Sequence, residues 1–180
     1  MAPGETTIFG IVGWSGSGKN TLMLDLLPNL IERGYQISTM KHTHHNFDMD
    51  KPGKDSFQHR EAGAYEVLIT GSKRWALLHE NRNELEPDIE TLLSTMAPVD
   101  LVLIEGFKSH PHRKLEVFRP SVGKPLLATS DQSIVAVVSD QPIENPSLPV
   151  LDLNNIPAVG DFIVDFCRLD KRHRDGSTYR

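Results

Sequence analysis

The residues with the clearest chemical potential lie near the start of the chain, in the string GWSGSGKN from Gly13 to Asn20. Their spacing matches the phosphate-binding pattern G-x-x-x-x-G-K-[ST], the Walker A motif. Glycines allow successive backbone N–H groups to turn toward an anion, and Lys19 adds a point charge for the β- and γ-phosphates. We therefore predict a nucleotide-phosphate site formed by Gly13, Trp14, Ser15, Gly16, Ser17, Gly18, Lys19, Asn20 and Thr21.

Two other interpretations of this string are weaker. A glycine-rich turn without a ligand would not need the apolar strand before it and the amphipathic helix after it, which are the context of a phosphate loop. A dinucleotide-binding G-x-G-x-x-G pattern lacks its third glycine. Asn20 is the one irregular position, because a serine or threonine hydroxyl normally ligates magnesium there.

An acidic residue at the end of a later apolar run forms the second candidate. Residues 99–104 read VDLVLI and are followed by Glu105 and Gly106, an arrangement that is typical of a Walker B strand. Glu105 could hold magnesium directly or through water, or orient an attacking water, and it is our candidate catalytic residue. The alternative is an acid exposed to solvent at the end of a strand.

A dense polar segment forms the third candidate, after the second predicted strand. We expect it to close on nucleotide phosphates or on a second anionic ligand; its members are Lys41, His42, His44, His45, Asp48, Asp50, Lys54 and Asp55. Asp48 or Asp50 could supply the magnesium contact that Asn20 lacks, so the predicted magnesium ligands are Asn20, Asp48 and Glu105. Structural zinc is disfavoured because no C-x-x-C or H-E-x-x-H spacing occurs, whereas a merely solvated loop remains an alternative.

These residues require a scaffold that brings the ends of parallel strands together. Strands are expected at 6–13, 36–41, 66–70, 74–79, 99–105, 114–119, 133–139 and 149–153, and helices at 18–33, 55–62, 87–96 and 158–169. The alternation predicts an α/β, P-loop NTPase-like fold, a mostly parallel sheet flanked by helices, with additional antiparallel strands at the 66–79 hairpin. Pro28 should kink or break the first helix, Gly34 should follow its end, and Asp55 should cap the second.

Composition limits the class of protein. We expect one nucleotide-binding domain over residues 1–169, followed by a polar, disordered tail at 170–180. A net charge of −5 argues against nonspecific nucleic-acid binding. Cys167 is the single cysteine, which excludes an internal disulfide, indicates a reducing compartment and predicts a buried thiol. No apolar run reaches membrane-spanning length, so a cytoplasmic location is expected. Trp75 could belong to a core or to an interface.

Together these strings resemble the MobB family, the molybdopterin-guanine dinucleotide biosynthesis adaptor proteins. The resemblance is carried by GWSGSGK at 13–19, KHTHH at 41–45, DMDKPGKDS at 48–56, RWAL at 74–77 and IEGFK at 104–108. It implies a homodimer that binds GTP, has at most weak GTPase activity, and assists the MobA-type enzyme that joins GMP to molybdopterin. The cofactors implied are GTP and Mg²⁺, with molybdopterin as a further candidate ligand. Asn20 departs from the family pattern, in which this position resembles threonine.

The sequence leaves base recognition and activity open. No N-K-x-D string occurs, but Asp140 follows a predicted strand and could accept from guanine N1 and N2, unless Ser139–Pro142 is merely a turn. No arginine finger or water-positioning glutamine is evident, which agrees with slow hydrolysis. Two alternatives to the adaptor function remain: a P-loop kinase acting on a small metabolite, and a carrier whose essential ligand is the pterin.

Overall fold

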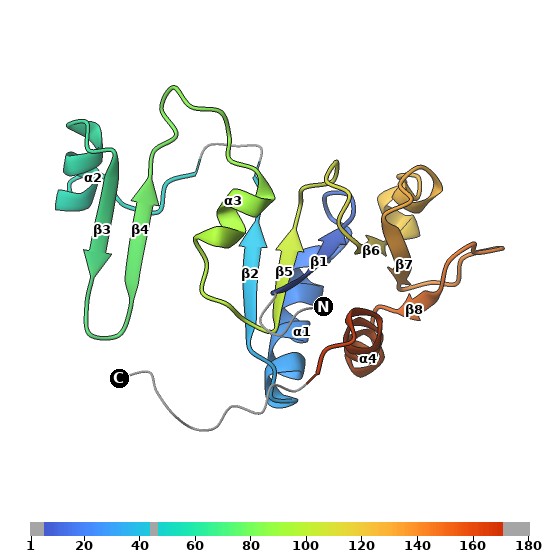
Figure 1. The fold of residues 1–180 in the computed structure, drawn as a ribbon. Coiled ribbons are helices and arrows are strands. Elements are labelled where there is room, and N and C mark those ends of the chain that lie inside the picture. Colours follow the sequence, from blue (N-terminus) through green and yellow to red (C-terminus); the bar gives the residue numbers. More distant parts are fainter. Residues whose placement is uncertain (1–5, 44–46, 171–180) are drawn as a thin grey trace. The chain divides into compact units, whose positions relative to one another are not determined.

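A parallel sheet supports the phosphate loop. The computed structural model describes residues 6–43 and 47–170, and in these residues the larger sheet has six strands in the order β2-β5-β1-β6-β7-β8, all parallel (Figure 1). The strands are β1 (Thr7–Val12), β2 (Ile37–Lys41), β5 (Leu101–Glu105), β6 (Lys114–Phe118), β7 (Ile134–Ser139) and β8 (Val150–Asp152). Strand order reverses at β1, so the switch point lies where the phosphate loop begins.

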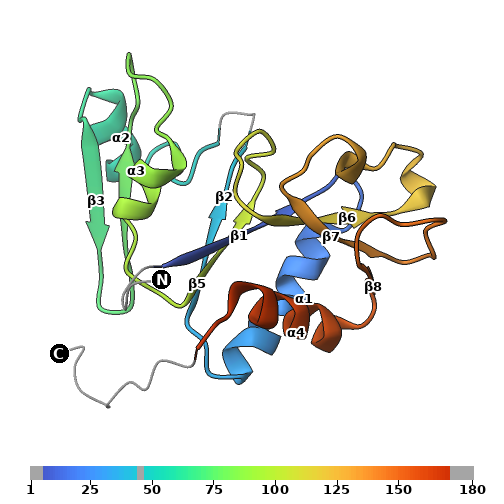
Figure 2. The same ribbon diagram turned by 45° about the vertical axis from the view of Figure 1, so that its right-hand side comes forward.

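Two helices cover one face of this sheet. Helices α1 (Lys19–Glu32) and α4 (Ile156–Cys167) lie side by side there (Figure 2). Their buried residues join alternate residues of four strands in one core: Phe9, Ile11, Leu22, Met23, Leu26, Leu30, Leu101, Leu103, Leu115, Val117, Ala136, Val138, Leu153, Val159, Ile163 and Cys167. Two short 3₁₀ helices, η1 (Pro120–Val122) and η2 (Leu127–Thr129), lie between β6 and β7. The α/β, mostly parallel class predicted from the sequence is confirmed.

Helices α1 and α4 differ from the sequence prediction at two points, the interior of α1 and the start of α4. Helix α1 is not broken at Pro28, because Leu26 and Leu30 on either side are fully buried and their packing holds the helix together. Its end agrees with the prediction: Gly34 has a left-handed φ of 95°, and its N–H donates to Ile31 O. Helix α4 begins two residues earlier than expected, because the Asn155 side chain accepts from Ala158 N.

Residues 43–97 form a second compact unit, inserted in sequence between β2 and β5, while residues 1–42 and 98–180 form the first. The second unit contains α2 (Asp55–Glu61), the antiparallel pair β3 (Glu66–Thr70) and β4 (Trp75–His79), and α3 (Ile89–Ser94). The hairpin is therefore confirmed. Whether both units act as the one nucleotide-binding domain that we expected stays a prediction, and residues 171–180 of the expected tail lie outside the described residues.

Two details of the second unit correct the sequence prediction. Asp55 is the first residue of α2 and not its cap; Lys54 occupies the cap position and makes no side-chain hydrogen bond there. Helix α3 is shorter than residues 87–96, because the Asp88 side chain accepts from Thr91 N and starts it later. Trp75 is 67% exposed, so the alternative that placed it in a core is wrong.

Among the described residues, no helix has both the length and the apolar character needed to cross a membrane. Cys167 is buried, as expected, and burial raises the pKa of its thiol to about 12. A thiol with so high a pKa is protonated at neutral pH and is not a nucleophile.

Candidate phosphate site

The phosphate loop leaves the carboxyl end of β1 and enters α1. Gly13, Gly16 and Gly18 have φ values of 149°, 81° and 97°, a region that side chains with a Cβ rarely adopt. Gly13 is restricted further, because a Cβ there would collide with the carbonyl oxygen of Val117 on β6. Ser17 N donates to Trp14 O at 3.2 Å and closes the turn before the helix begins. The loop therefore has the glycine-dependent shape that the spacing predicted.

Lys19 lies folded over this loop. Its Nζ donates to Gly13 O at 2.9 Å and to Trp14 O at 2.8 Å. Burial lowers the pKa of Lys19, and the negative charge of Glu105 opposes that change. The ammonium is thus held at the mouth of the loop by two carbonyl oxygens, which phosphate oxygens could replace.

Glu105 ends β5, on one side of β1, and is mostly buried. Its Oε2 lies 3.1 Å from Lys41 Nζ at the end of β2, and the Glu105 side chain is only 15% exposed. Lys41 and Glu105 are direct neighbours in the parallel register of β2 and β5. The structure therefore places the strand-end acid Glu105 beside Lys41, the first residue of the predicted polar segment, at the carboxyl edge of the sheet, as expected for parallel strands.

His42 continues from β2 over the Glu105 loop. Its backbone N–H donates to Glu105 O at 2.9 Å, and its ring lies 4.5 Å from the Phe107 ring. Gly106 has a φ of 98°, and a Cβ there would stand 3.0 Å from His42 Cβ. His42 therefore packs against the backbone that carries Glu105, which is a structural contribution to the site.

Trp14 ties the phosphate loop to the segment between β6 and β7. Its Nε1–H donates to Pro125 O at 2.7 Å. The ammonium groups of Lys108 and Lys124 lie 4.9 Å and 5.9 Å from the centre of the indole ring. The charges of Lys41 and Lys108 both lower the pKa of Lys19, so the mouth of the loop is rich in positive groups that suit a polyphosphate.

Arg119 is the functional candidate that the sequence reasoning missed. It follows β6 directly, and its Nε donates to Ser17 O in the phosphate loop at 3.1 Å. Its NH1 lies 3.3 Å from Asp140 Oδ2 at the end of β7. A signal existed, because an arginine just after a buried strand must lie at the same sheet edge as the phosphate loop. Asp140 therefore supports Arg119, while a direct role of Asp140 in base recognition stays a prediction.

The remaining polar residues of the predicted loop belong to the second unit. Arg60 NH2 contacts Asp48 Oδ1 and Asp50 Oδ1, each at 3.0 Å, and NH1 lies 3.5 Å from Glu80 Oε1. The hydrogen bond with Asp50 is the main reason that the pKa of Arg60 is raised. His44 and His45 lie outside the described residues, and the roles assigned to Asp48, Asp50, Lys54 and Asp55 as a ligand loop stay predictions.

The donor set for magnesium is small. Within residues 6–43 and 47–170, no three His, Cys, Asp or Glu side chains are grouped closely enough to hold a metal ion by themselves. Magnesium in nucleotide sites needs only one or two carboxylates beside phosphate oxygens and water. Glu105 fits that role, whereas Asn20, which is exposed in the first turn of α1, offers an amide oxygen in place of a hydroxyl.

A parallel sheet with a glycine-rich loop, a lysine and a strand-end acid at its switch point defines a P-loop NTPase-like protein. Comparisons with known proteins agree. A crystal structure of molybdopterin-guanine biosynthesis protein B has a TM-score of 0.71 and 25% identity over 88% of this chain and 99% of that chain. The MobB homolog from Bacillus stearothermophilus, with a TM-score of 0.67 and 24% identity over 91% and 99% of the two chains, shows the same fold.

The family itself is settled by sequence. The family model for molybdopterin guanine dinucleotide synthesis protein B matches residues 8–140. The molybdopterin-guanine dinucleotide biosynthesis adapter protein of Escherichia coli strain K12 is 40% identical over 168 residues, which cover 91% of this chain and 95% of that protein. The adapter protein of Haemophilus influenzae is 40% identical over 159 residues, 88% of each chain. The chain belongs to the MobB family.

Proposed function

We propose that this protein is a GTP-binding adaptor in the synthesis of molybdopterin guanine dinucleotide. The observation that carries the proposal is the phosphate loop at the switch point of the sheet, with Lys19 over its mouth and Glu105 beside it. Relatives named as adapter proteins of this biosynthesis supply the pathway. The adaptor would act in the cytoplasm beside a MobA-type guanylyltransferase, which uses GTP as the source of the GMP group. Mg²⁺ would be bound to the phosphates and to Glu105.

GTP binding and assistance to the guanylyltransferase are tested in separate experiments. Isothermal titration with GTP should show one site per chain, and Lys19→Ala should weaken binding at least tenfold because it removes a charge at the phosphates. Lys73→Ala is the control, since Lys73 is exposed in the turn between β3 and β4 and belongs to no predicted phosphate contact. A purified guanylyltransferase with molybdopterin and GTP should then form product faster when the wild-type adaptor is added than when Lys19→Ala is added.

The alternative functions have distinct signatures in the same experiments. Steady phosphorylation of a small acceptor would contradict the adaptor function and support a kinase. Retention of molybdopterin without any requirement for GTP would favour a pterin carrier. Slow release of inorganic phosphate alone would agree with an adaptor that has weak GTPase activity.

A homodimer is part of the same proposal, and the second unit offers a surface for it. Leu68, Trp75 and Leu77 share one face of the β3–β4 hairpin and are 62%, 67% and 46% exposed. A two-stranded sheet with an uncovered apolar face and two open edges is marginally stable alone, which favours pairing with a second copy. Sedimentation should therefore show a dimer for wild type and a monomer for Leu77→Asp, whereas the exposed loop variant Leu85→Asp should stay dimeric.

A further inference from the structure

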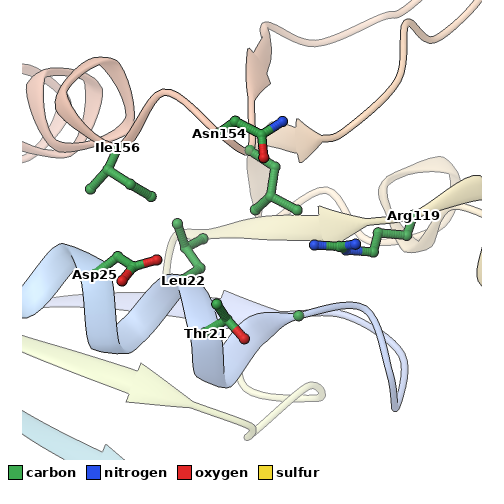
Figure 3. A pocket seen from close by; sticks show the side chains of 8 residues that line it. Thr21, Leu22, Asp25, Arg119, Asn154 and Ile156 are labelled. Atoms are coloured by element: carbon green, nitrogen blue, oxygen red, sulfur yellow. The ribbon is translucent and has the colours of Figure 1, made fainter.

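A cavity of about 200 Å³ adjoins the phosphate loop within the first unit (Figure 3). It lies between the first turns of α1 and the turn that joins β8 to α4. Its lining residues are Gly18, Thr21, Leu22, Asp25, Arg119, Leu153, Asn154 and Ile156. Gly18 belongs to the phosphate loop itself, so a ligand held by the loop can extend directly into this cavity.

The cavity combines an apolar floor with a few converging polar groups. Leu22, Leu153 and Ile156 supply the apolar surface. In Figure 3 the guanidinium of Arg119 and the carboxylate of Asp25 approach from opposite sides, and the amide oxygen of Asn154 points between them. Small-molecule sites have this composition, in which apolar walls provide burial and a few polar groups fix orientation.

The structure holds two of these polar groups in place. Arg119 is fixed by Ser17 O at 3.1 Å and Asp140 Oδ2 at 3.3 Å. Asn154 donates its Nδ2 to Asp152 Oδ1 at 3.1 Å, which leaves its Oδ1 directed toward the cavity. Both groups are therefore oriented before any ligand arrives, and pre-organisation lowers the entropic cost of binding.

The position of the cavity relative to the charged groups sets the direction of a bound nucleotide. Lys41 and Glu105 end β2 and β5 on one side of β1, whereas Arg119 and Asn154 follow β6 and β8 on the other side. The terminal phosphate and its cation belong with the lysines and Glu105. The nucleoside must then extend toward β6 and β8, which is where the cavity lies.

Building on the proposed function, we propose that this cavity is the guanine subsite of the nucleotide site. Guanine carries two acceptors, O6 and N7, on one edge and two donors, N1–H and N2–H₂, on the neighbouring edge. An arginine fork matches O6 and N7, and a carboxylate accepts from N1–H and N2–H₂. Arg119 and Asp25 stand on opposite sides of the cavity with these two complementary chemistries, and Asp140 acts through Arg119 as a positioning residue.

Adenine fits the same groups poorly. It would direct its N6–H₂ donor at the arginine and its N1 acceptor at the carboxylate, so both polar contacts would be repulsive. Discrimination by polar groups that are left unpaired exceeds discrimination by shape alone. The pair Arg119 and Asp25 therefore accounts for a preference for GTP without an N-K-x-D string.

The test exchanges the hydrogen-bonding character of one residue. Asp25→Asn gives the side chain an amide donor, which suits the C2 carbonyl of xanthine and opposes the N2 amino group of guanine. Titration with GTP, ATP, xanthosine triphosphate and tripolyphosphate should show at least a tenfold loss of GTP affinity and a gain for xanthosine triphosphate. Tripolyphosphate affinity should not change, because it uses only the phosphate loop. Glu32→Gln is the matched control, an exposed acid on the same helix outside the cavity.

The outcomes separate the two proposals. If Asp25→Asn binds tripolyphosphate normally and keeps the wild-type preference among the three nucleotides, the base lies elsewhere and the subsite is refuted while the proposed function stands. If wild type binds neither GTP nor tripolyphosphate, the proposed function fails and the subsite fails with it. Arg119→Gln should also reduce the ratio of GTP to ATP affinity, with tripolyphosphate reporting any separate effect on the loop.

Discussion

Replacing Lys114 by methionine should reveal how the loop after β5 is anchored. Lys114 is fully buried at the start of β6. Its Nζ donates to Lys108 O at 2.9 Å and to His110 O at 2.7 Å, and it lies 3.3 Å from Asp131 Oδ2. Methionine fills nearly the same space without any of these contacts, so the variant removes the polar anchor and keeps the packing.

The expected loss follows from opposing contributions. Each hydrogen bond from a charged donor is worth about 1.5–3 kcal/mol, and removing one member of a buried ion pair costs about 3–5 kcal/mol. Against this, methionine avoids the desolvation of a buried ammonium group, which is several kcal/mol. Asp131 is 30% exposed and can recover water contacts. We therefore expect a loss of about 2–3 kcal/mol in the free energy of unfolding.

Urea unfolding followed by circular dichroism measures this loss, with Lys124→Met as the control. Lys124 is exposed, so its change should stay within about 0.5 kcal/mol. A second readout is His112, whose pKa is lowered to about 4 by burial first and by the Lys114 charge second. Its pKa in the variant, followed by NMR, should rise toward 6.5. Equal stability of the two variants together with an unchanged His112 pKa would refute the reasoning.

Three further changes test neighbouring features. Gly10→Ala should lower the free energy of unfolding by about 1–3 kcal/mol, because the added Cβ would collide with the His112 ring and stand 2.7 Å from Lys114 Cβ. Gly71→Ala is the control in the same urea assay and should have little effect, because its nearest neighbour would be 3.8 Å away. Acid should destabilise the fold between pH 6.5 and about 4, since the unfolded chain binds a proton at His112 that the folded protein excludes. After allowance for solvent screening, the loss in the free energy of unfolding is about 1–2 kcal/mol. His112→Asn should flatten that part of the pH–stability curve. Asn20→Thr should increase the dependence of GTP affinity on magnesium, measured by titration with and without the ion, and an unchanged dependence would show that the missing hydroxyl is unimportant.

Local patterns predicted the glycine-dependent turn after β1 and most strands correctly, because their signals lie within a few adjacent residues. The run before Gly13 is apolar on both faces, as a central parallel strand must be, and the glycine spacing fixes the turn after it. Gly34 marked the end of α1 for an equally local reason. The N-terminal caps of the helices were harder to predict from the sequence. Asn155 and Asp88 start their helices through side-chain hydrogen bonds that many Asn and Asp residues could make.

Several side-chain contacts that depend on strand order were not predicted from the sequence. Arg119 lies 102 positions from Ser17 along the chain and meets it only because β6 pairs with β1. Asp25 and Thr21 are one helical turn apart, yet nothing in the spacing shows that Asn154 faces them across a cavity. The polar run after β2 was treated as one loop, whereas Lys41 and His42 belong to the first unit and Asp48 to the second.

The distribution of charge around the phosphate loop supports an adaptor more than a fast hydrolase. Glu105 pairs with Lys41 at 3.1 Å, so its carboxylate is already engaged and is poorly suited to activate water. Arg119, the arginine that contacts the loop, follows β6 and pairs with Asp140, while Glu105 ends β5 on the other side of β1. In the proposed orientation of the nucleotide, Arg119 lies toward the base and would not stabilise charge at the terminal phosphate, which is the contribution that accelerates hydrolysis in fast GTPases. The arrangement of these residues therefore agrees with the proposed adaptor function and with slow hydrolysis.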